Sequence, residues 1–483
     1  MKVSKSLGDN LKYIKDKIDG PKTFDFFNRD FKIAGRDVSL IYVDGLTNGD
    51  ILVWLLKFLM DIEEEDLSID FLEKLVQSKL PYTEIDLLDD VDTIIDDVLA
   101  GPQVLLIDGE DKAIKIDARG WEMRGPEEPE LEKATRGAED GFIETMVLNV
   151  GMVRRRIRDP KLRVEPFKLG SRSKTDVGVL YIDDRVDKDL LKEVKQKLEE
   201  ADLEGLPLAD RTVDDILTGQ GINFLPKVRY SNRPDIVAAH LLEGKICVIT
   251  DNSPTALILP AVFLDHTQNL EEYRYPPLIG SYFKAIRFIA IFLGLILPPL
   301  WLLMAYGPDW VPEALEFIGP EEVGQISLGA QFIIATIGID LIRIASIQTP
   351  TALATSLSLI GALILGEFSI EVGLFNPETI LYLAIGTIGT FAIPGLEIAL
   401  FFEIARLILI ILVVFLRTPG FIGGVVVIFM LFLFTKSFGI PYLWPLIPFK
   451  WKALKTYIFR QSALNLDERR HEESKEDNTR PSE

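Results

Sequence analysis

The chain has 483 residues and a formal net charge of -21 at pH 7, yet its mean hydropathy is +0.20. A high net charge and a positive mean hydropathy are seldom found together in a single soluble domain. The composition therefore argues against one soluble domain and predicts a chain with a water-exposed part and a membrane part. The single cysteine, Cys247, excludes an internal disulfide and a cysteine-based metal cluster. Its neighbours in KICVIT predict a buried strand residue.

Residues 1–275 are charged throughout, with acidic clusters at 63–66 and 86–97. The N-terminal segment 1–30 has no apolar run of signal-peptide length, so we expect this half to stay in the cytoplasm. An internal repeat pairs DVSLIYVD at 37–44 with DVGVLYID at 176–183, and 98–118 with 240–261. The repeat predicts two related α/β subdomains, 31–120 and 170–275. In the first, Asp108 and Gly109 are typical of a two-residue hairpin turn.

A linker, 121–169, separates the subdomains and contains one predicted amphipathic helix within 134–162, ending at Pro160. Its apolar positions are Phe142, Met146, Leu148, Val150, Met152, Val153 and Ile157. Arg154, Arg155 and Arg156 form a basic cluster near its end. The acidic host domain argues against nucleic acid, so we expect ion pairs within or between subunits, or contacts with lipid headgroups.

Signals for catalysis are absent from the sequence. It contains neither a Walker-type phosphate loop nor GxGxxG, and its three histidines lack metal-ligand spacing. His240 is expected on a helix before a strand, and His266 in a turn or interface. The sequence therefore points away from an enzyme and predicts no cofactor or metal.

Residues 283–445 are mostly apolar and predict a membrane domain of five or six helical segments, because about 20 apolar residues cross a bilayer. The candidate segments are 288–308, 326–347, 351–370, 379–400, 404–416 and 421–440. The segment 404–416 is short for a full crossing. Basic residues before the first segment and in the tail 446–483 place both ends in the cytoplasm, with a juxtamembrane helix and a disordered tail.

Charges inside these segments are unexpected, because one at the centre of a membrane helix costs about 2.5 to 3.5 kcal/mol. Asp340 and Arg343 lie three positions apart on one helix and can pair. Arg343 could reach the headgroups with Asp340 as its partner, or both could face a water-filled path or a neighbouring subunit. The other candidates for an ion path are Glu367, Glu397 and Glu403, together with the helix break at Pro394 and Gly395. Arg343 and Arg406 are candidates for ion pairs or an interface.

Several stretches resemble one family, the A subunits of GerA-type spore germination proteins. They are GFIETMVLNVGMVRRRIRDPKL at 141–162, SKTDVGVLYID at 173–183, 232–263 and the membrane segment around FAIPG. The resemblance spans nearly the whole chain, and 346–378 is more similar to a sporulation protein than to a nutrient-receptor subunit. Departures at 136–141 and 225–227 argue against carrying over a germinant-specific role.

The resemblance implies a cytoplasmic domain of two parts and a membrane domain in the spore inner membrane. It also implies a ring-like homo-oligomer, such as a pentamer, that releases monovalent cations and amplifies germination with a small membrane partner protein and other germination proteins. The hypothesis is an oligomeric cation channel or channel subunit. A non-conducting receptor or scaffold subunit is the alternative. A secondary transporter is the weaker third possibility, because the apolar segments show no inverted repeat.

Overall fold

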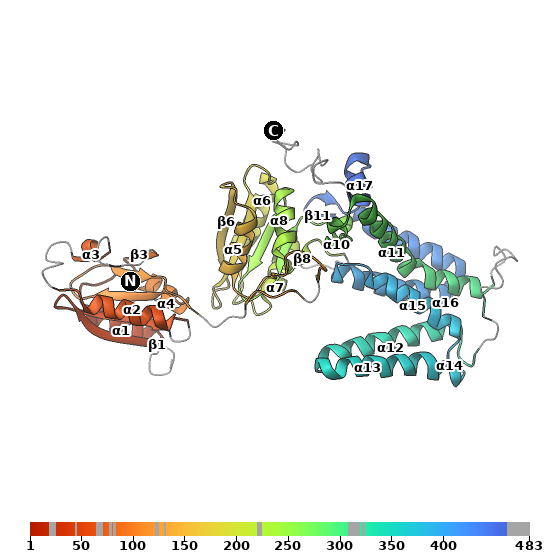
Figure 1. Cartoon of the computed structure of the whole chain (residues 1–483), viewed down its shortest axis with the longest axis horizontal. Coiled ribbons are helices and arrows are strands. Elements are labelled where there is room, and N and C mark those ends of the chain that lie inside the picture. Colours follow the sequence, from red (N-terminus) through yellow and green to blue (C-terminus); the bar gives the residue numbers. More distant parts are fainter. Residues whose placement is uncertain are drawn as a thin grey trace. The chain divides into compact units, whose positions relative to one another are not determined.

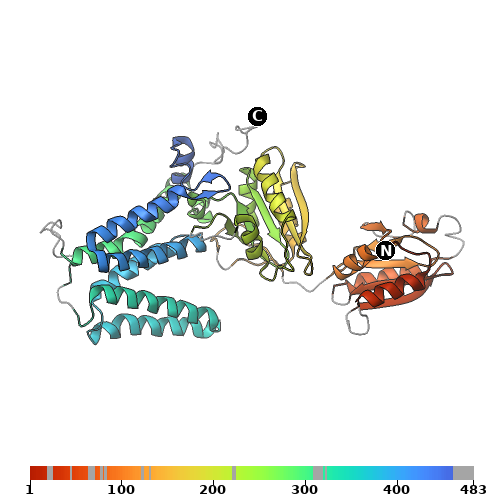
Figure 2. The ribbon, with the colours of Figure 1, turned by 180° about the vertical axis from the view of Figure 1, so that it is seen from behind.

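The chain is described here by a computed structural model (Figure 1, and from behind in Figure 2). The described residues are 1–18, 26–43, 46–63, 71–76, 80, 84–120, 125–129, 132–219, 225–307, 319–320 and 324–460. The chain folds as two compact units, Met1–Arg124 and Gly125–Glu483.

The first unit is a five-stranded antiparallel sheet with helices on both faces. Its strands are β1 (Phe26–Ile33), β2 (Arg36–Val43), β3 (Ile85–Leu88), β4 (Gln103–Ile107) and β5 (Ala113–Ile116), in the order β1-β2-β4-β5-β3. Its helices are α1 (Leu7–Ile18), α2 (Gly49–Met60), α3 (Phe71–Lys74) and α4 (Val91–Leu99). Alternate residues of β4 enter two cores, because successive strand side chains point to opposite faces. Helices α2 and α3 cover one face, and α1 and α4 cover the other.

The second unit begins with a sheet of the same design. Its strands are β6 (Leu162–Leu169), β7 (Thr175–Ile182), β8 (Arg229–Ser231), β9 (Ile246–Thr250) and β10 (Ala256–Leu259), in the order β6-β7-β9-β10-β8. Its helices are α5 (Met146–Arg156), α6 (Lys188–Glu199), α7 (Ala209–Thr218) and α8 (Pro234–Leu242). The repeated sequences fall on equivalent strands, β2 with β7 and β4–β5 with β9–β10. The predicted class, two related α/β subdomains followed by a helical membrane region, is confirmed.

Two local predictions were wrong. The connection between β4 and β5 spans 108–112 rather than two residues, although Gly109 does adopt a positive φ of 90°. Helix α5 is also shorter than the predicted helix, covering only Met146–Arg156. The amide of Asn149 bonds both the backbone N–H and the carbonyl of Ile143, at 2.9 and 2.5 Å. This side chain holds the preceding turn in a non-helical conformation.

The remainder of the second unit is a helical bundle. Short helices α9 (Phe263–His266) and α10 (Leu270–Arg274) lead from the sheet into α11 (Pro277–Ala305). The bundle continues with α12 (Leu328–Gln348), α13 (Thr351–Leu363), the π-helical turn η5 (Ile364–Phe368), α14 (Ser369–Glu371), α15 (Pro377–Phe391) and α16 (Leu396–Phe434). The chain then forms the hairpin β11 (Lys436–Ser437) and β12 (Ile440–Pro441), followed by α17 (Trp451–Ile458). Among the described residues, four helices are long and apolar enough to cross a membrane: Pro277–Ala305, Leu328–Gln348, Leu353–Glu371 and Leu396–Phe434.

Helix α16 is a hairpin of two arms, 396–416 and 418–434. Arg417 between them has φ 53° and ψ -134°, which a continuous helix cannot accommodate. The arms pack along their length, since Phe432 lies 5.6 Å from Phe401 between ring centroids and a Cβ on Gly424 would meet Leu409. The segments predicted at 404–416 and 421–440 therefore fall on separate arms. The predicted segment 379–400 is instead interrupted, because α15 ends at Phe391 and α16 begins at Leu396.

Candidate functional site

Four charged side chains meet inside the helical bundle, and we call them the membrane charge cluster: Asp340, Arg343, Glu403 and Arg406. Arg343 of α12 donates two hydrogen bonds to Glu403 of the first α16 arm, Nη1 to Oε2 at 2.5 Å and Nη2 to Oε1 at 2.9 Å. This bidentate geometry is the strong form of an arginine–carboxylate pair. Asp340 lies 3.6 Å from Arg343, and its side chain is 37% exposed. The cluster therefore contains two acids and two bases and is formally neutral.

Arg406 is the most buried member of the cluster, with 1% of its side chain exposed. Its guanidinium lies 3.9 Å from Glu403 and donates to the Thr390 hydroxyl at 3.1 Å and the Gly294 carbonyl at 3.3 Å. Four helices, α11, α12, α15 and α16, thus supply its partners directly or through Glu403. Such contacts compensate charges removed from water. Arg343 thus pairs with an acid on another helix of the same chain as well as with Asp340 on its own helix.

The interruption between α15 and α16, residues 392–395, is called the break. It includes the predicted Pro394 and Gly395. Arg287 of α11 donates to the Ala392 carbonyl at 2.7 Å, and its Nε lies 2.6 Å from Glu272 of α10. The Gly395 N–H donates to the His266 carbonyl at 3.2 Å. Arg287 of α11 and His266 of α9 therefore satisfy backbone groups that the missing helical turn leaves open.

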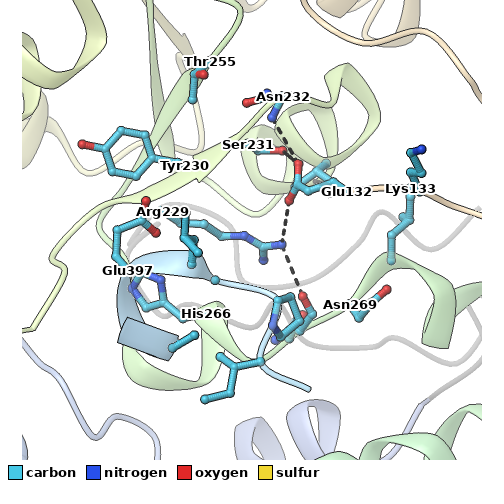
Figure 3. Close-up of a pocket in the computed structure, with 18 of the residues that line it drawn as sticks. Glu132, Lys133, Arg229, Tyr230, Ser231, Asn232, Thr255, His266, Asn269 and Glu397 are labelled. Atoms are coloured by element: carbon cyan, nitrogen blue, oxygen red, sulfur yellow. Dashed lines mark hydrogen bonds and ion pairs between the residues drawn. The ribbon is translucent and has the colours of Figure 1, made fainter. Parts of the chain in front are cut away.

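A cavity of about 590 Å³ lies where this break meets the second sheet (Figure 3). Glu397 lines it from the first turn of α16, and Arg229, Tyr230 and His266 line it from the soluble side. Arg229 is held by the Asp265 carbonyl at 2.8 Å and lies 3.8 Å from Glu132. Sequence reasoning missed Arg229 and Arg287, because their importance depends on contacts between segments distant in the chain.

Burial controls the charge of several groups at this junction. Burial lowers the pKa of His266 to about 3 and that of His240 to about 4, so both imidazoles are neutral at pH 7. Lys245 and Asp265 form a buried pair at 2.6 Å, and Tyr457 of α17 donates to the other Asp265 oxygen at 3.0 Å. The C-terminal helix is thereby tied to the soluble subdomain through charge-assisted contacts.

The remaining candidates lie apart from the cluster and the break. Glu367 is exposed on η5, and no basic side chain in the described ranges pairs with it. At the end of α5, Arg156 lies 2.5 Å from Asp140, while Arg154 donates to the Asp159 and Leu162 carbonyls. Arg155 is exposed. The acidic partner described for this basic cluster is thus a neighbouring loop residue, Asp140.

The family described as "Bacillus/Clostridium GerA spore germination protein" matches residues 12–472. This chain belongs to the GerA family. Stage V sporulation protein AF of Bacillus subtilis (strain 168) is 38% identical over 95% of this chain and 93% of its own length. Spore germination protein KA of the same strain is 28% identical over 99% of this chain and 88% of its own length. The resemblance to GerA-type A subunits, and within them to the AF protein, is confirmed.

Among solved structures, a similar one is the N-terminal domain of the A subunit of the Bacillus megaterium spore germinant receptor GerK3. It is 26% identical, covers 55% of this chain and 98% of that domain, and has a TM-score of 0.22. Family membership and the four candidate spans together identify this GerA-family chain as a spore germination membrane protein.

Proposed function

We propose that this GerA-family protein is an oligomeric cation channel, or a subunit of one, that releases monovalent cations and amplifies germination. The observation that carries the proposal is the exposure of α13 and its continuation. Only 11% of the span Leu353–Glu371 is buried within the protomer. The corresponding shares are 22% for α12, 44% for α11 and 56% for α16.

Polar side chains occupy this exposed span. Thr355, Ser356 and Ser358 are exposed on α13, and Glu367 is exposed on η5. A carboxylate facing lipid is costly, so intramembrane charges normally face protein or water. Ser356 and Glu367 both lie on this span, Ser356 on α13 and Glu367 on the π-helical turn that continues it. Packing of several copies around these faces would place hydroxyls and carboxylates in a shared aqueous path.

The proposed ion path therefore centres on Glu367, because a ring of carboxylates attracts cations. Glu397 would line the cavity beside the break at the cytoplasmic end. Asp340 and Glu403 are compensated by Arg343 within the protomer, which favours a role in holding α12 against α16. We place the protein in the spore inner membrane with both ends on the core side, in a ring such as a pentamer with a small membrane partner protein.

Reconstitution of the purified full chain tests this proposal. We expect a homo-oligomer in nanodiscs and release of K⁺ from loaded liposomes. Glu367→Gln should reduce the flux about tenfold, since it removes one charge per subunit from the path. Glu193→Gln, on the surface of α6, is the matched control and should leave flux unchanged. A monomer, or equal flux for both variants, would reject the proposed path.

A non-conducting receptor or scaffold subunit is the second candidate. The contacts of Arg287 and His266 with the break favour it, because they couple the soluble subdomain directly to membrane helices. An intact oligomer without flux under any condition, still able to bind germination proteins, would support the scaffold role.

A further inference from the structure

A groove at the end of the second α16 arm combines an apolar wall with two lysines. Its volume is about 560 Å³, and its apolar side chains are Val427, Met430, Leu431 and Phe434. Lys227, Thr435 and Lys436 line the polar end. Residues at spacings of three, four and seven share one helix face, so the apolar residues form one stripe. That stripe is about 10 Å long, at 1.5 Å per residue.

The stripe is accessible from outside the protomer. Phe434 is 76% exposed, and Val427 and Met430 are 59% and 41% exposed. It belongs to a helix long and apolar enough to span a membrane, and it runs to the end of that helix. In a bilayer these side chains would meet acyl chains, while the polar end would lie at the headgroup level.

The two lysines come from segments that are fixed to each other. Ser437, the neighbour of Lys436, donates from its hydroxyl to the Lys227 carbonyl at 2.7 Å. The Ala261 N–H also bonds both the Lys227 carbonyl and the Ser437 hydroxyl, at 3.2 and 3.0 Å. Ser437 is fully buried, so solvent does not compete for these bonds. The loop before β8 and the hairpin after α16 therefore hold their lysines at one place.

Both ammonium groups remain available for a ligand. Among the described residues, neither Lys227 nor Lys436 forms an ion pair, and Lys436 is exposed. The carbonyls at the end of α16 carry partial negative charge, which would repel an anion without nearby cations. Two lysines at this end supply the compensation, and basic pockets beside membrane helices on the cytoplasmic side recognise anionic lipid headgroups.

From this geometry we propose that the groove is a binding site for one anionic phospholipid. The phosphate is held between Lys227 and Lys436, and an acyl chain lies along the stripe from Phe434 to Val427. The proposal is independent of ion conduction, because it needs only that the chain spans a membrane. In this proposal, Lys227 of the loop before β8 contacts a lipid headgroup beside the second arm of α16.

Native mass spectrometry of the full chain, extracted from nanodiscs of mixed phosphatidylglycerol and phosphatidylcholine, tests the site. We expect about tenfold preferential retention of phosphatidylglycerol, lost in the Lys227→Gln, Lys436→Gln double variant. The matched control removes two exposed lysines outside the groove, Lys168→Gln with Lys192→Gln, and should keep the preference. Met430→Trp fills the apolar wall and should reduce retention although both lysines remain.

Inorganic phosphate in excess distinguishes a lipid from a free anion and should not displace the bound lipid. Equal retention of the two lipids by the unmodified chain would overturn the proposal. So would an unchanged preference in the groove double variant, or displacement of the lipid by phosphate alone. Circular dichroism and oligomer size of each variant report whether it remains folded, and Met430→Trp supplies an independent arm if the double variant does not.

Discussion

The α12–α13 hairpin and the bundle of α11, α15 and α16 differ in how the polar and charged side chains of their membrane segments are partnered. In the bundle, Arg406 is 1% exposed, and its guanidinium and Glu403 are paired with groups on other helices. On α13 hydroxyls remain exposed, Glu367 on the following η5 is exposed too, and little of this span is buried. Arg343 of α12 joins the two regions through Glu403. The comparison suggests that one protomer is enough to satisfy the charges of the bundle. The polar groups of the exposed α13 span, in contrast, need water or a neighbouring protomer.

Removal of the central acid should have the largest effect on stability. Glu403→Gln leaves Arg343 and buried Arg406 without their shared carboxylate, which should lower the free energy of unfolding by about 3 to 5 kcal/mol. Glu367→Gln on the exposed span should change it by less than about 0.5 kcal/mol. Thermal unfolding in nanodiscs measures both variants. Equal effects would erase the distinction between the two regions.

The second-largest loss of stability should come from removing the Arg287 contacts at the break. Arg287→Met leaves Glu272, 3% exposed, with a buried charge and opens the Ala392 carbonyl, at a cost of about 3 kcal/mol. Arg274→Met is the control, because its partner Asp235 keeps a second arginine, Arg233, at 2.9 Å. Unfolding measurements should separate the two variants. A larger loss in the control would contradict the role given to the break.

Glycine substitutions test how tightly the bundle is closed. A Cβ on Gly389 would lie 2.3 Å from the Ala290 carbonyl oxygen, so Gly389→Ala should cost up to about 3 kcal/mol. A Cβ on Gly423 of α16 meets nothing within 4 Å, and Gly423→Ala should stabilise the helix by about 0.5 to 1 kcal/mol. The thermal unfolding midpoints of the Gly389→Ala and Gly423→Ala variants test this prediction. Tolerance of Gly389→Ala would mean that α11 and α15 do not pack this closely.

Acid should weaken the junction between sheet and bundle. The pKa of His266 is lowered to about 3 from 6.5, so the unfolded state binds more protons between these values and stability falls as pH falls through this window. At pH 5 this group alone accounts for a loss of about 2 kcal/mol relative to pH 7. His266→Asn should flatten that part of the profile, while His240, lowered to about 4, retains its own contribution. An identical pH profile for the variant would refute the assignment.

The sequence predicted elements that depend on local pattern. The repeated strand at 37–44 and 176–183, the apolar segments and the interruption at Pro394 and Gly395 all follow from periodicity or from residues that cannot continue a helix. The turn at Arg417 was placed between two predicted segments, but its hairpin depends on Gly420 and Gly424 packing against the first arm. A local sequence pattern cannot predict this contact between the two arms.

Partners separated in the chain could not be predicted in the same way. Arg343 was paired locally with Asp340, yet its bidentate partner is Glu403, sixty residues later. The helix predicted within 134–162 is confined to Met146–Arg156, because Asn149 bonds backward to Ile143 and competes with helical hydrogen bonds. Arg287 lies among the basic residues before the first predicted membrane segment, and only the fold brings it to the carbonyl of Ala392.

Thiol accessibility tests the central claim most directly, because the single native cysteine, Cys247, is buried. Ser356→Cys on α13 and Ile404→Cys on α16, each exposed in the protomer, are treated in liposomes with a membrane-impermeant thiol reagent. Water enclosed by several copies predicts rapid modification of Ser356→Cys with block of K⁺ flux, and no modification of Ile404→Cys, which faces lipid. Equal inertness of both cysteines would contradict a water-filled path along α13.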